Sequence, residues 1–343
     1  MKALVLKDYN VLSYEDVPEP ERGPDEVLVR VKACGICGSD VHGMDGSTGR
    51  RMPPVIMGHE AAGVVAEVGA KVADFAASDR VTFDSTIWCG DCPYCARGQV
   101  NLCDARRVLG VSCSDYRQNG AFAEYVAVPR RILYRLPEGV SFEQAALVEP
   151  LSVALHAVRQ IPPSPRDTAV VVGAGVIGTL IVQSLKAAGC GHIIAVDIDE
   201  TRLELACRLG AGEGLNAKGG DVLGRVRQAT GGAGADLAFE AVGVTAALRT
   251  AVDCLRKGGS LIQVGNISPT AELPLQTVVT RELSIFGSYA SAGEYPACLE
   301  MIVRGEVNVD ALISAVAPLA DGAAWFKRLH RGERALLKVV LVP

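Results

Sequence analysis

Regular alternation of strands and helices in the second half of the chain is the feature that most limits its fold. Short apolar runs rich in β-branched residues predict strands, and the stretches between them predict helices. Six such strands with intervening helices predict a doubly wound parallel sheet, an α/β fold that binds dinucleotides. The expected strands are 169–172, 192–197, 213–216, 236–240, 259–264 and 283–286.

A glycine-rich turn, VVVGAGVIG, follows the first of these strands. Gly173 permits a tight turn, Gly175 lets the backbone approach a pyrophosphate, and Gly178 allows close helix–strand packing. The helix N-terminus offers amide donors and a partial positive charge to phosphate groups. The motif therefore predicts a nucleotide site, with Val176 and Ile177 as further contact residues. A domain that binds another nucleotide, or none, is the alternative.

An acidic residue ends the second strand, in the sequence IIAVDID. Asp197 can accept hydrogen bonds from the adenosine ribose and would repel the extra phosphate of NADP. We therefore expect NAD, although Arg202 is a residue that could accommodate that phosphate. By the switch-point rule, the turns after the fourth and fifth strands should flank the nicotinamide. Their candidate residues are Val242, Gly243, Val264 and Gly265.

Four cysteines lie close together in the stretch WCGDCPYCARGQVNLCD. They are Cys89, Cys92, Cys95 and Cys103. Four thiolates at this spacing suit a tetrahedral zinc ion with no open coordination position, which holds a loop in shape and does no chemistry. A pair of disulfides is the alternative, but such bonds are rare inside cells.

Length and composition favour a two-domain protein of ordinary globular type. The chain has 343 residues with 49% hydrophobic and 21% charged residues, and two domains are the natural expectation. A net charge of −5 gives no basic footprint for nucleic acid or an anionic membrane. The segment MKALVLKDYN does not read as a secretory signal, and glycines interrupt the apolar run 168–185. We expect a cytoplasmic protein without a membrane span.

The first 140 or so residues are predicted to form a small β-barrel. Short β-branched runs at 4–7, 26–33, 61–69, 80–83 and 124–128 are separated by Gly and Pro clusters. Ser141 and Gln144 then form a capping-box pattern that begins a helix. We expect Pro150 to divide this helix from a second one that runs to about Gln160.

Several motifs together resemble one enzyme family. These motifs are ACGICGSDVH (33–42), PPVIMGHEAAGVV (53–65), the cysteine lobe, GAFAEY (120–125), ALVEPLSVALHAV (146–158) and VGAGVIG. They resemble the zinc-dependent medium-chain alcohol dehydrogenases, most closely the sorbitol (polyol) and butanediol dehydrogenase branch. The resemblance implies a GroES-like catalytic domain over residues 1–150, completed by about 291–343, and a Rossmann NAD-binding domain over 151–290.

The resemblance also implies a second, catalytic zinc, so that each chain would hold two ions. Cys37 and His59 match the thiolate and imidazole ligands, Glu60 matches the neighbouring acid that binds zinc in polyol members, and Glu149 stands where other members have a second cysteine. Glu149 could bind directly or through water. Ser39 resembles the hydroxyl of the family's proton relay, and His42 matches its histidine, with either a relay role or a cofactor contact.

The implied reaction is hydride transfer between a secondary alcohol and NAD, with activation of the hydroxyl by zinc. Polyol members carry an aromatic residue after SDVH and an Arg-Tyr pair after the sixth strand, where this chain has Gly43 and Ala290. A vicinal diol, a sugar acid or a cyclic polyol is therefore also a candidate substrate. Family members form dimers or tetramers through the nucleotide-binding domain, so we expect a homo-oligomer.

Two other functions compete with this one. The first is a zinc-independent, NADPH-dependent reductase of activated double bonds, and the second is a non-enzymatic nucleotide-binding or structural protein on the same scaffold. The four candidate ligands of the catalytic zinc disfavour both, and Asp197 further disfavours the NADPH-dependent reductase.

Overall fold

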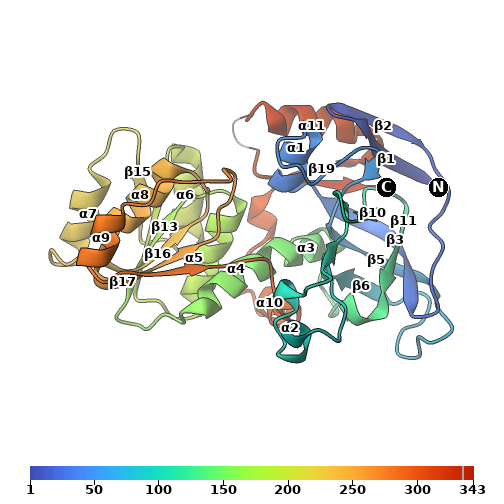
Figure 1. The fold of residues 1–343 in the computed structure, drawn as a ribbon, viewed down its shortest axis with the longest axis horizontal. Helices are drawn as coiled ribbons and strands as arrows, with labels where there is room; N and C mark the ends of the chain where they lie inside the picture. The colour runs from blue at the N-terminus through green and yellow to red at the C-terminus, as the bar shows by residue number, and fades with distance from the viewer. Residues whose placement is uncertain (334–335) are drawn as a thin grey trace. The chain divides into compact units, whose positions relative to one another are not determined.

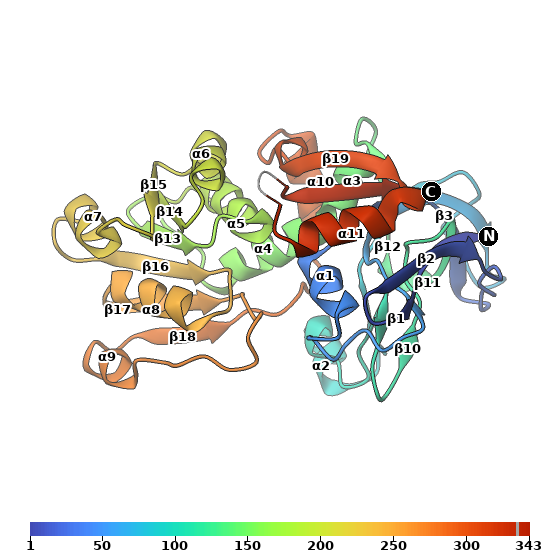
Figure 2. The same cartoon turned by 90° about the horizontal axis from the view of Figure 1, so that it is seen from above.

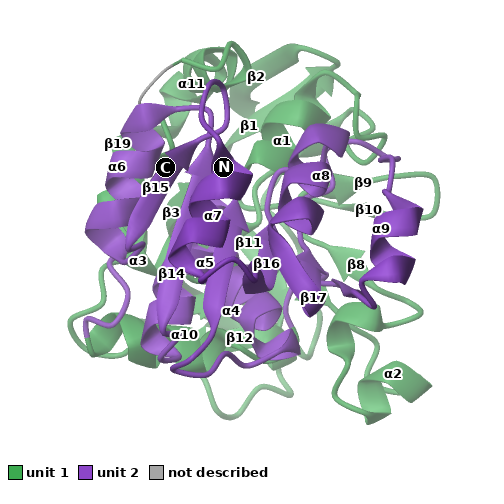
Figure 3. Ribbon diagram, turned by 90° about the vertical axis from the view of Figure 1, so that its left-hand side faces the viewer, with its two compact units in different colours: residues 1–149, 292–304, 309–343 green, residues 150–291, 305–308 purple. Residues whose placement is uncertain are grey.

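A computed structural model describes residues 1–333 and 336–343 of the chain. The chain divides into two compact units, shown in different colours in Figure 3. Unit 1 comprises residues 1–149, 292–304 and 309–343, and unit 2 comprises residues 150–291 and 305–308. Both ends of the chain belong to unit 1, so this unit is assembled from distant stretches of sequence (Figure 1).

Unit 1 is built on a seven-stranded sheet in the order β12-β6-β5-β3-β20-β19, with β11 also paired to β3. Its strands are β3 (Glu26–Gly35), β5 (Glu60–Val68), β6 (Arg80–Phe83), β11 (Tyr125–Pro129), β12 (Leu133–Arg135), β19 (Ile313–Pro318) and β20 (Lys338–Val342). A three-stranded sheet contains β1 (Lys2–Asp8), β2 (Val11–Asp16) and β4 (Val55–Ile56). Two small hairpin-like pairs are β7 (Thr86–Ile87) with β8 (Arg107–Val108), and β9 (Val111–Ser112) with β10 (Arg117–Gln118).

The helices of unit 1 are α1 (Gly38–Met44), α2 (Pro93–Ala96), α3 (Phe142–Ala146), α10 (Tyr295–Val303) and α11 (Gly322–His330). Among them, α3 packs against β3 and β5, and α11 packs against β2. Figure 2 shows α11 near β1 and β2, and its buried Phe326 meets Phe122 edge-on with ring centroids 5.6 Å apart. This aromatic pair ties the late helix into the core formed by the early strands.

The helical segment around Pro150 differs in part from its prediction. Ser141 caps α3 and forms a capping box with Gln144, as expected. The break comes at Leu147, however, and Pro150 lies in the first turn of α4 (Val148–Gln160). The prediction that Pro150 divides the helices is wrong because the first turn has no amide that must bond within the helix, so proline is tolerated there.

Unit 2 contains a six-stranded parallel sheet in the order β15-β14-β13-β16-β17-β18. Its strands are β13 (Thr168–Val172), β14 (His192–Asp197), β15 (Glu213–Asn216), β16 (Ala235–Glu240), β17 (Leu255–Gln263) and β18 (Ser284–Gly287). The helices are α5 (Val176–Ala187), α6 (Glu200–Leu209), α7 (Val222–Ala229), α8 (Thr245–Cys254) and α9 (Leu275–Thr280). The predicted doubly wound parallel sheet is confirmed.

The central strand of this sheet explains why its sequence reads as one apolar run. All five residues of β13 are buried, because β14 and β16 flank the strand and helices pack on it. No helix within the described ranges has both the length and the apolar character needed to cross a bilayer.

Candidate metal centres and dinucleotide turn

Three candidate ligands of the catalytic metal meet at one end of the barrel sheet of unit 1. Strands β3 and β5 are antiparallel and place Gly35 opposite Glu60, while Cys37 follows β3 as the N-cap of α1. One donor atom each of Cys37, His59 and Glu60 lies within 4.8 Å of the other two. A sulfur, an imidazole nitrogen and a carboxylate oxygen at this separation suit zinc.

Two glycines give these ligands their space. A Cβ on Gly35 would lie 2.4 Å from Oε2 of Glu60, so the smallest residue leaves room for the carboxylate. Gly58, just before His59, has φ +94°, and a Cβ there would lie 2.8 Å from the backbone nitrogen of Phe122. The backbone therefore requires glycine at the turn that delivers His59.

A buried lysine faces the carboxylate of Glu60. Nζ of Lys338, on β20, donates to Oε2 of Glu60 at 2.5 Å and to the carbonyl of Ile36 at 3.1 Å. Burial is the largest influence and lowers the pKa of Lys338, but the charges of Glu60, Cys37 and Glu149 and the hydrogen bond to Glu60 together raise the pKa above its usual value. Because both side chains are nearly inaccessible to solvent, this ion pair supplies a cation that Glu60 requires when no metal is bound.

A second buried ion pair lies behind the imidazole. Asp40 is fully buried and accepts hydrogen bonds from Arg51, and its Oδ1 lies 3.4 Å from Nδ1 of His59, where the geometry is not that of a hydrogen bond. Burial is the largest influence and lowers the pKa of His59, but Asp40 and Cys37 together raise the pKa well above its usual value. The charge of a carboxylate at this distance raises the basicity of the imidazole.

The proposed relay residues lie on α1. Ser39 is exposed and its Oγ donates to Sγ of Cys37 at 3.3 Å, so the hydroxyl lies beside the metal group. His42 is exposed further along the same helix, and its backbone carbonyl accepts a hydrogen bond from Ser47. The structure thus brings Ser39 to the candidate ligands, whereas the role of His42 stays a prediction.

Glu149 lies near the three ligands without joining their group. Its Oε1 accepts a hydrogen bond from Ser85 at 3.0 Å. Among the residues that the structure describes, its carboxylate is not within 4.8 Å of all three donor atoms of Cys37, His59 and Glu60. Removal from water raises the pKa of Glu149, partly countered by the charge of His59. Its ligand role stays a prediction.

The cysteine lobe forms a second potential metal site. The sulfurs of Cys89, Cys92, Cys95 and Cys103 lie within 4.8 Å of one another. Sγ of Cys103 lies 3.5 Å from that of Cys89, and Cys89 lies 3.9 Å from Cys95. Four sulfurs at about 2.3 Å from a tetrahedral ion are separated by about 3.8 Å, so these distances fit zinc.

Backbone amides favour the thiolate form of one cysteine in this lobe, Cys92. The amides of Cys95 and Asp104 lower the pKa of Cys92 to about 6, and Cys92 also caps the short helix α2. None of the eleven cysteines, all of which lie in the described ranges, forms a disulfide. The lobe therefore offers four thiol groups to a metal, as a zinc site requires.

The glycine turn of unit 2 has the geometry that a dinucleotide needs. Gly173 has φ +97°, and a Cβ on Gly178 would lie 1.6 Å from the carbonyl oxygen of Gly173. A Cβ on Gly175 would point into open space, at the N-cap of α5, where no side chain caps the helix. The first amides of α5, which include those of Val176 and Ile177, are thus available to a phosphate group.

Asp197 ends β14 and is tied to this turn. Its Oδ2 accepts from the amide of Ala174 at 2.6 Å, and its Oδ1 accepts from the amides of Ile198 and Asp199. Asp199, which the sequence analysis did not single out, caps α6 through the amides of Thr201 and Arg202. Asp197 therefore stabilises the turn through three backbone hydrogen bonds, and its Oδ2, which accepts only one of them, retains a lone pair for a ribose hydroxyl.

The turns after β16 and β17 pack tightly together. The carboxylate of Glu240 is fully buried and accepts from the amides of Val242 and Gly243, and from Nε2 of Gln263. A Cβ on Gly265 would lie 2.2 Å from the amide nitrogen of Gly243. The predicted contact residues Val242, Gly243, Val264 and Gly265 thus form one cluster at the carboxyl edge of the sheet, and Val242 also contacts Gly173.

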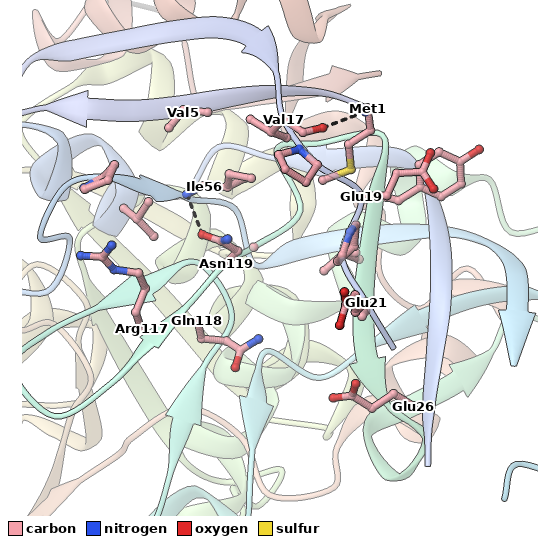
Figure 4. Close-up of a pocket in the computed structure, with 18 residues that line it drawn as sticks. Met1, Val5, Val17, Glu19, Glu21, Glu26, Ile56, Arg117, Gln118 and Asn119 are labelled. Atoms are coloured by element: carbon pink, nitrogen blue, oxygen red, sulfur yellow. Dashed lines mark hydrogen bonds between the residues drawn. The ribbon is translucent and has the colours of Figure 1, made fainter. Parts of the chain in front are cut away.

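A hollow in unit 1 is unrelated to these sites. Figure 4 shows this cavity of about 620 Å³ between the start of the chain and the strands β4, β10 and β11. Its lining contains none of the candidate metal ligands. The residues labelled there are Met1, Val5, Val17, Glu19, Glu21, Glu26, Ile56, Arg117, Gln118 and Asn119. The donor atoms, and not this hollow, identify the candidate active site.

Comparison with known proteins is consistent with these sites. Residues 23–138 match the family model described as Alcohol dehydrogenase GroES-like domain, and residues 176–304 match that described as Zinc-binding dehydrogenase. The chain is 35% identical to a sorbitol dehydrogenase of Bacillus subtilis (strain 168) over 348 aligned positions, which cover 100% of this chain and 97% of the relative.

Solved structures resemble the chain over its whole length. One is a zinc-binding dehydrogenase from Sinorhizobium meliloti 1021 bound to NADP, with TM-score 0.92, 32% identity and coverage of 100% and 99% of the two chains. Another is an alcohol dehydrogenase from Escherichia coli CFT073 complexed with NADH, with TM-score 0.92, 30% identity and coverage of 100% and 99%.

Proposed function

Because the chain belongs to the family of zinc-dependent medium-chain alcohol dehydrogenases, we propose that it transfers a hydride between a secondary alcohol and NAD. The observation that carries this proposal is the group of Cys37, His59 and Glu60, whose donor atoms lie within 4.8 Å of one another. The first competing function, a zinc-independent reductase, would have no use for these three ligands.

We assign the catalytic zinc to Cys37, His59 and Glu60, with Glu149 as a further ligand, and a structural zinc to the four cysteines of the lobe. Zinc at the first site would supply a Lewis acid that makes the alcohol hydroxyl more acidic. Ser39, whose hydroxyl lies beside Cys37, accepts the released proton as it gives up its own, and His42 passes that proton toward solvent. Asp40 stabilises positive charge on the imidazole, and Lys338 holds the carboxylate of Glu60 in place through an ion pair.

The substrate is proposed to be a polyol, a vicinal diol or a sugar-derived alcohol. The chain has no aromatic side chain at Gly43, and Ala290 offers no donor where polyol members have arginine. A site without such donors discriminates weakly among polyhydroxylated substrates. We therefore expect activity on several compounds of this class, with the alcohol adjacent to a second oxygen as the shared feature.

A substrate panel tests this function. Purified protein with a measured zinc content would be incubated with polyols, diols, sugar acids and amino alcohols, and NADH formation would be followed by absorbance. We expect oxidation of at least one diol or polyol. Protein that holds two zinc ions and binds NAD but oxidises none of these compounds would contradict the proposal. A binding protein without enzymatic activity would then be favoured.

NAD is proposed as the preferred cofactor, because Asp197 stands at the end of β14 where a ribose phosphate would be repelled. The variant Asp197→Ala should shift the NAD/NADP ratio of kcat/KM toward NADP by about tenfold or more, the size of one to two kcal/mol of lost repulsion. Arg202→Ala is the matched control, which should reduce use of NADP. An unchanged ratio in Asp197→Ala would show that the assignment of Asp197 is wrong.

A homo-oligomer is proposed from the edge of the sheet in unit 2. Strand β18 lies at that edge and all four of its residues are exposed, including Ile285 and Phe286. Leu275 and Val279 of α9 are 66% and 65% exposed. An exposed apolar edge strand is a template for pairing with a second copy. Reduced cysteines throughout favour a location in the cytoplasm.

A further inference from the structure

A buried arginine lies beside the relay hydroxyl of unit 1. Arg51 is 4% exposed, and its Nε and Nη2 donate to Oδ1 of Asp40 at 3.2 and 2.9 Å. Nη1 donates to the carbonyl of Arg50 at 3.1 Å, and Nη2 also donates to Oγ of Ser39 at 3.4 Å. A planar guanidinium with partners on three sides has a fixed orientation.

Gly43 makes room for this arginine. It lies within α1, where glycine costs about 1 kcal/mol relative to alanine, and its φ is not positive. A Cβ at this position would lie 2.2 Å from Cγ and 3.1 Å from Cβ of Arg51. The stem of Arg51 therefore occupies the space that a side chain at position 43 would need.

The Ser39 hydroxyl is held between two partners. It receives a hydrogen bond from Arg51 and donates its own proton to Sγ of Cys37 at 3.3 Å. A hydroxyl has one proton and two lone pairs. With one lone pair facing Arg51, a single lone pair is left to accept a proton from a substrate; as it does so, the hydroxyl turns from Cys37 and releases its own proton to the next group of the relay, so that Ser39 ends as a neutral hydroxyl.

We propose that Arg51 is a positioning residue of the alcohol oxidation, which fixes the Ser39 hydroxyl against Cys37, and that Gly43 is the residue that admits it. This inference rests on the proposed function, because Ser39 matters only if it accepts a proton. It also separates this chain from polyol dehydrogenases with an aromatic residue at position 43, since arginine here occupies the space that such a side chain would need.

A double-mutant cycle tests the proposal. Arg51→Lys keeps a positive charge opposite Asp40 but removes Nη2, the guanidinium nitrogen that donates to Ser39. We expect Arg51→Lys to lower kcat by about tenfold and to change KM by less than about threefold. Misplacing a group that takes part in the reaction affects kcat more than KM. In the Ser39→Ala background the same substitution should lower kcat by less than about twofold. An equal loss in both backgrounds would overturn the proposal, and the exposed Arg50→Lys is the matched control.

A second measurement needs no substrate. In protein loaded with Co²⁺, the difference spectrum against Cys37→Ser isolates the absorption of the Cys37 thiolate. Loss of the hydrogen bond from Ser39 should move this band to longer wavelength in Ser39→Ala and in Arg51→Lys, but not in Arg50→Lys. An unshifted band in Arg51→Lys would overturn the proposal. A shifted band in a protein that oxidises no alcohol would refute the proposed function and leave the positioning contact intact.

Discussion

The two groups of potential metal ligands in unit 1 are built in different ways. The cysteine lobe takes its four ligands from residues 89–103, and backbone amides are the donors that approach its sulfurs. The other group combines Cys37, His59 and Glu60 with charged supports as distant as Lys338. Short local spacing makes the first site self-contained, whereas the second depends on the whole barrel.

The groups also differ in their surroundings. Cys89 is exposed and the other ligands of the lobe are mostly half-buried. Around His59 and Glu60, the ionisable groups Asp40, Arg51 and Lys338 are almost entirely buried and paired. A metal in the lobe would order a loop that is largely open to solvent. An ion next to Glu60 would instead change the electrostatic balance among buried ion pairs.

The largest effect is expected from removing the thiolate of the buried group. Cys37→Ser should lower kcat/KM for alcohol oxidation by about 1,000-fold or more, because the catalytic ion loses a ligand. Metal analysis should show one zinc per chain instead of two, with an unchanged far-ultraviolet circular dichroism spectrum. Unchanged activity would show that the buried group is not the catalytic centre.

The matched change in the lobe should affect stability instead. Cys92→Ser should remove the other zinc and lower the free energy of unfolding by several kcal/mol, since the binding energy of a structural ion is also folding energy. Activity per catalytic zinc should fall by less than about tenfold, because the lobe supplies no ligand to the buried group. If Cys92→Ser lost as much activity as Cys37→Ser while still holding one zinc per chain, the proposed division into a structural and a catalytic site would be wrong.

The buried charges can be tested through Lys338. In metal-free protein, Lys338→Met should lower the free energy of unfolding by about 3–5 kcal/mol, because Glu60 is left buried without a cation. Urea unfolding would measure this, and added zinc should stabilise the variant more than the wild type. The double variant Lys338→Met with Glu60→Gln is the control and should recover most of the loss. No recovery would show that packing, and not charge, is responsible.

A smaller effect concerns pH and a third buried acid near the site. Asp84 is 3% exposed, and burial raises its pKa to about 7. Between about pH 4 and 7 the unfolded chain has lost this proton and the folded chain keeps it, so stability falls as pH rises and then levels. Asp84→Asn should flatten the dependence of the free energy of unfolding on pH and raise this free energy by about 2 kcal/mol at pH 8. The exposed Asp25→Asn is the control, and an unaltered slope in Asp84→Asn would contradict the assignment.

The sequence predicted those parts that are encoded locally. The six strands of unit 2, the capping box at Ser141 and the doubly wound topology all follow from short-range patterns, and the structure confirms them. The spacing of the cysteines likewise points to one lobe. Local rules failed at Pro150, because the chain there tolerates proline within the first turn of α4.

The supports of the catalytic group could not be predicted in this way. Asp40 and Arg51 are eleven residues apart, and Lys338 is 278 residues from Glu60, so only the tertiary fold brings them together. One hint was present in the sequence, since Lys338 interrupts the apolar run LLKVVLV of the last strand. A charged side chain on a buried strand needs a partner, but sequence alone does not name it.

The interleaving of the two units along the chain has a consequence for biosynthesis. A polypeptide that emerges from the ribosome exposes almost the whole of unit 2 by residue 291, while unit 1 still lacks α10, α11, β19 and β20. Lys338 therefore reaches Glu60 only after β20 has been synthesised, 278 residues later in the chain than Glu60 itself. Unit 2 can fold while the chain is still growing, whereas the Lys338–Glu60 pair beside the candidate metal ligands is completed only after β20 has left the exit tunnel.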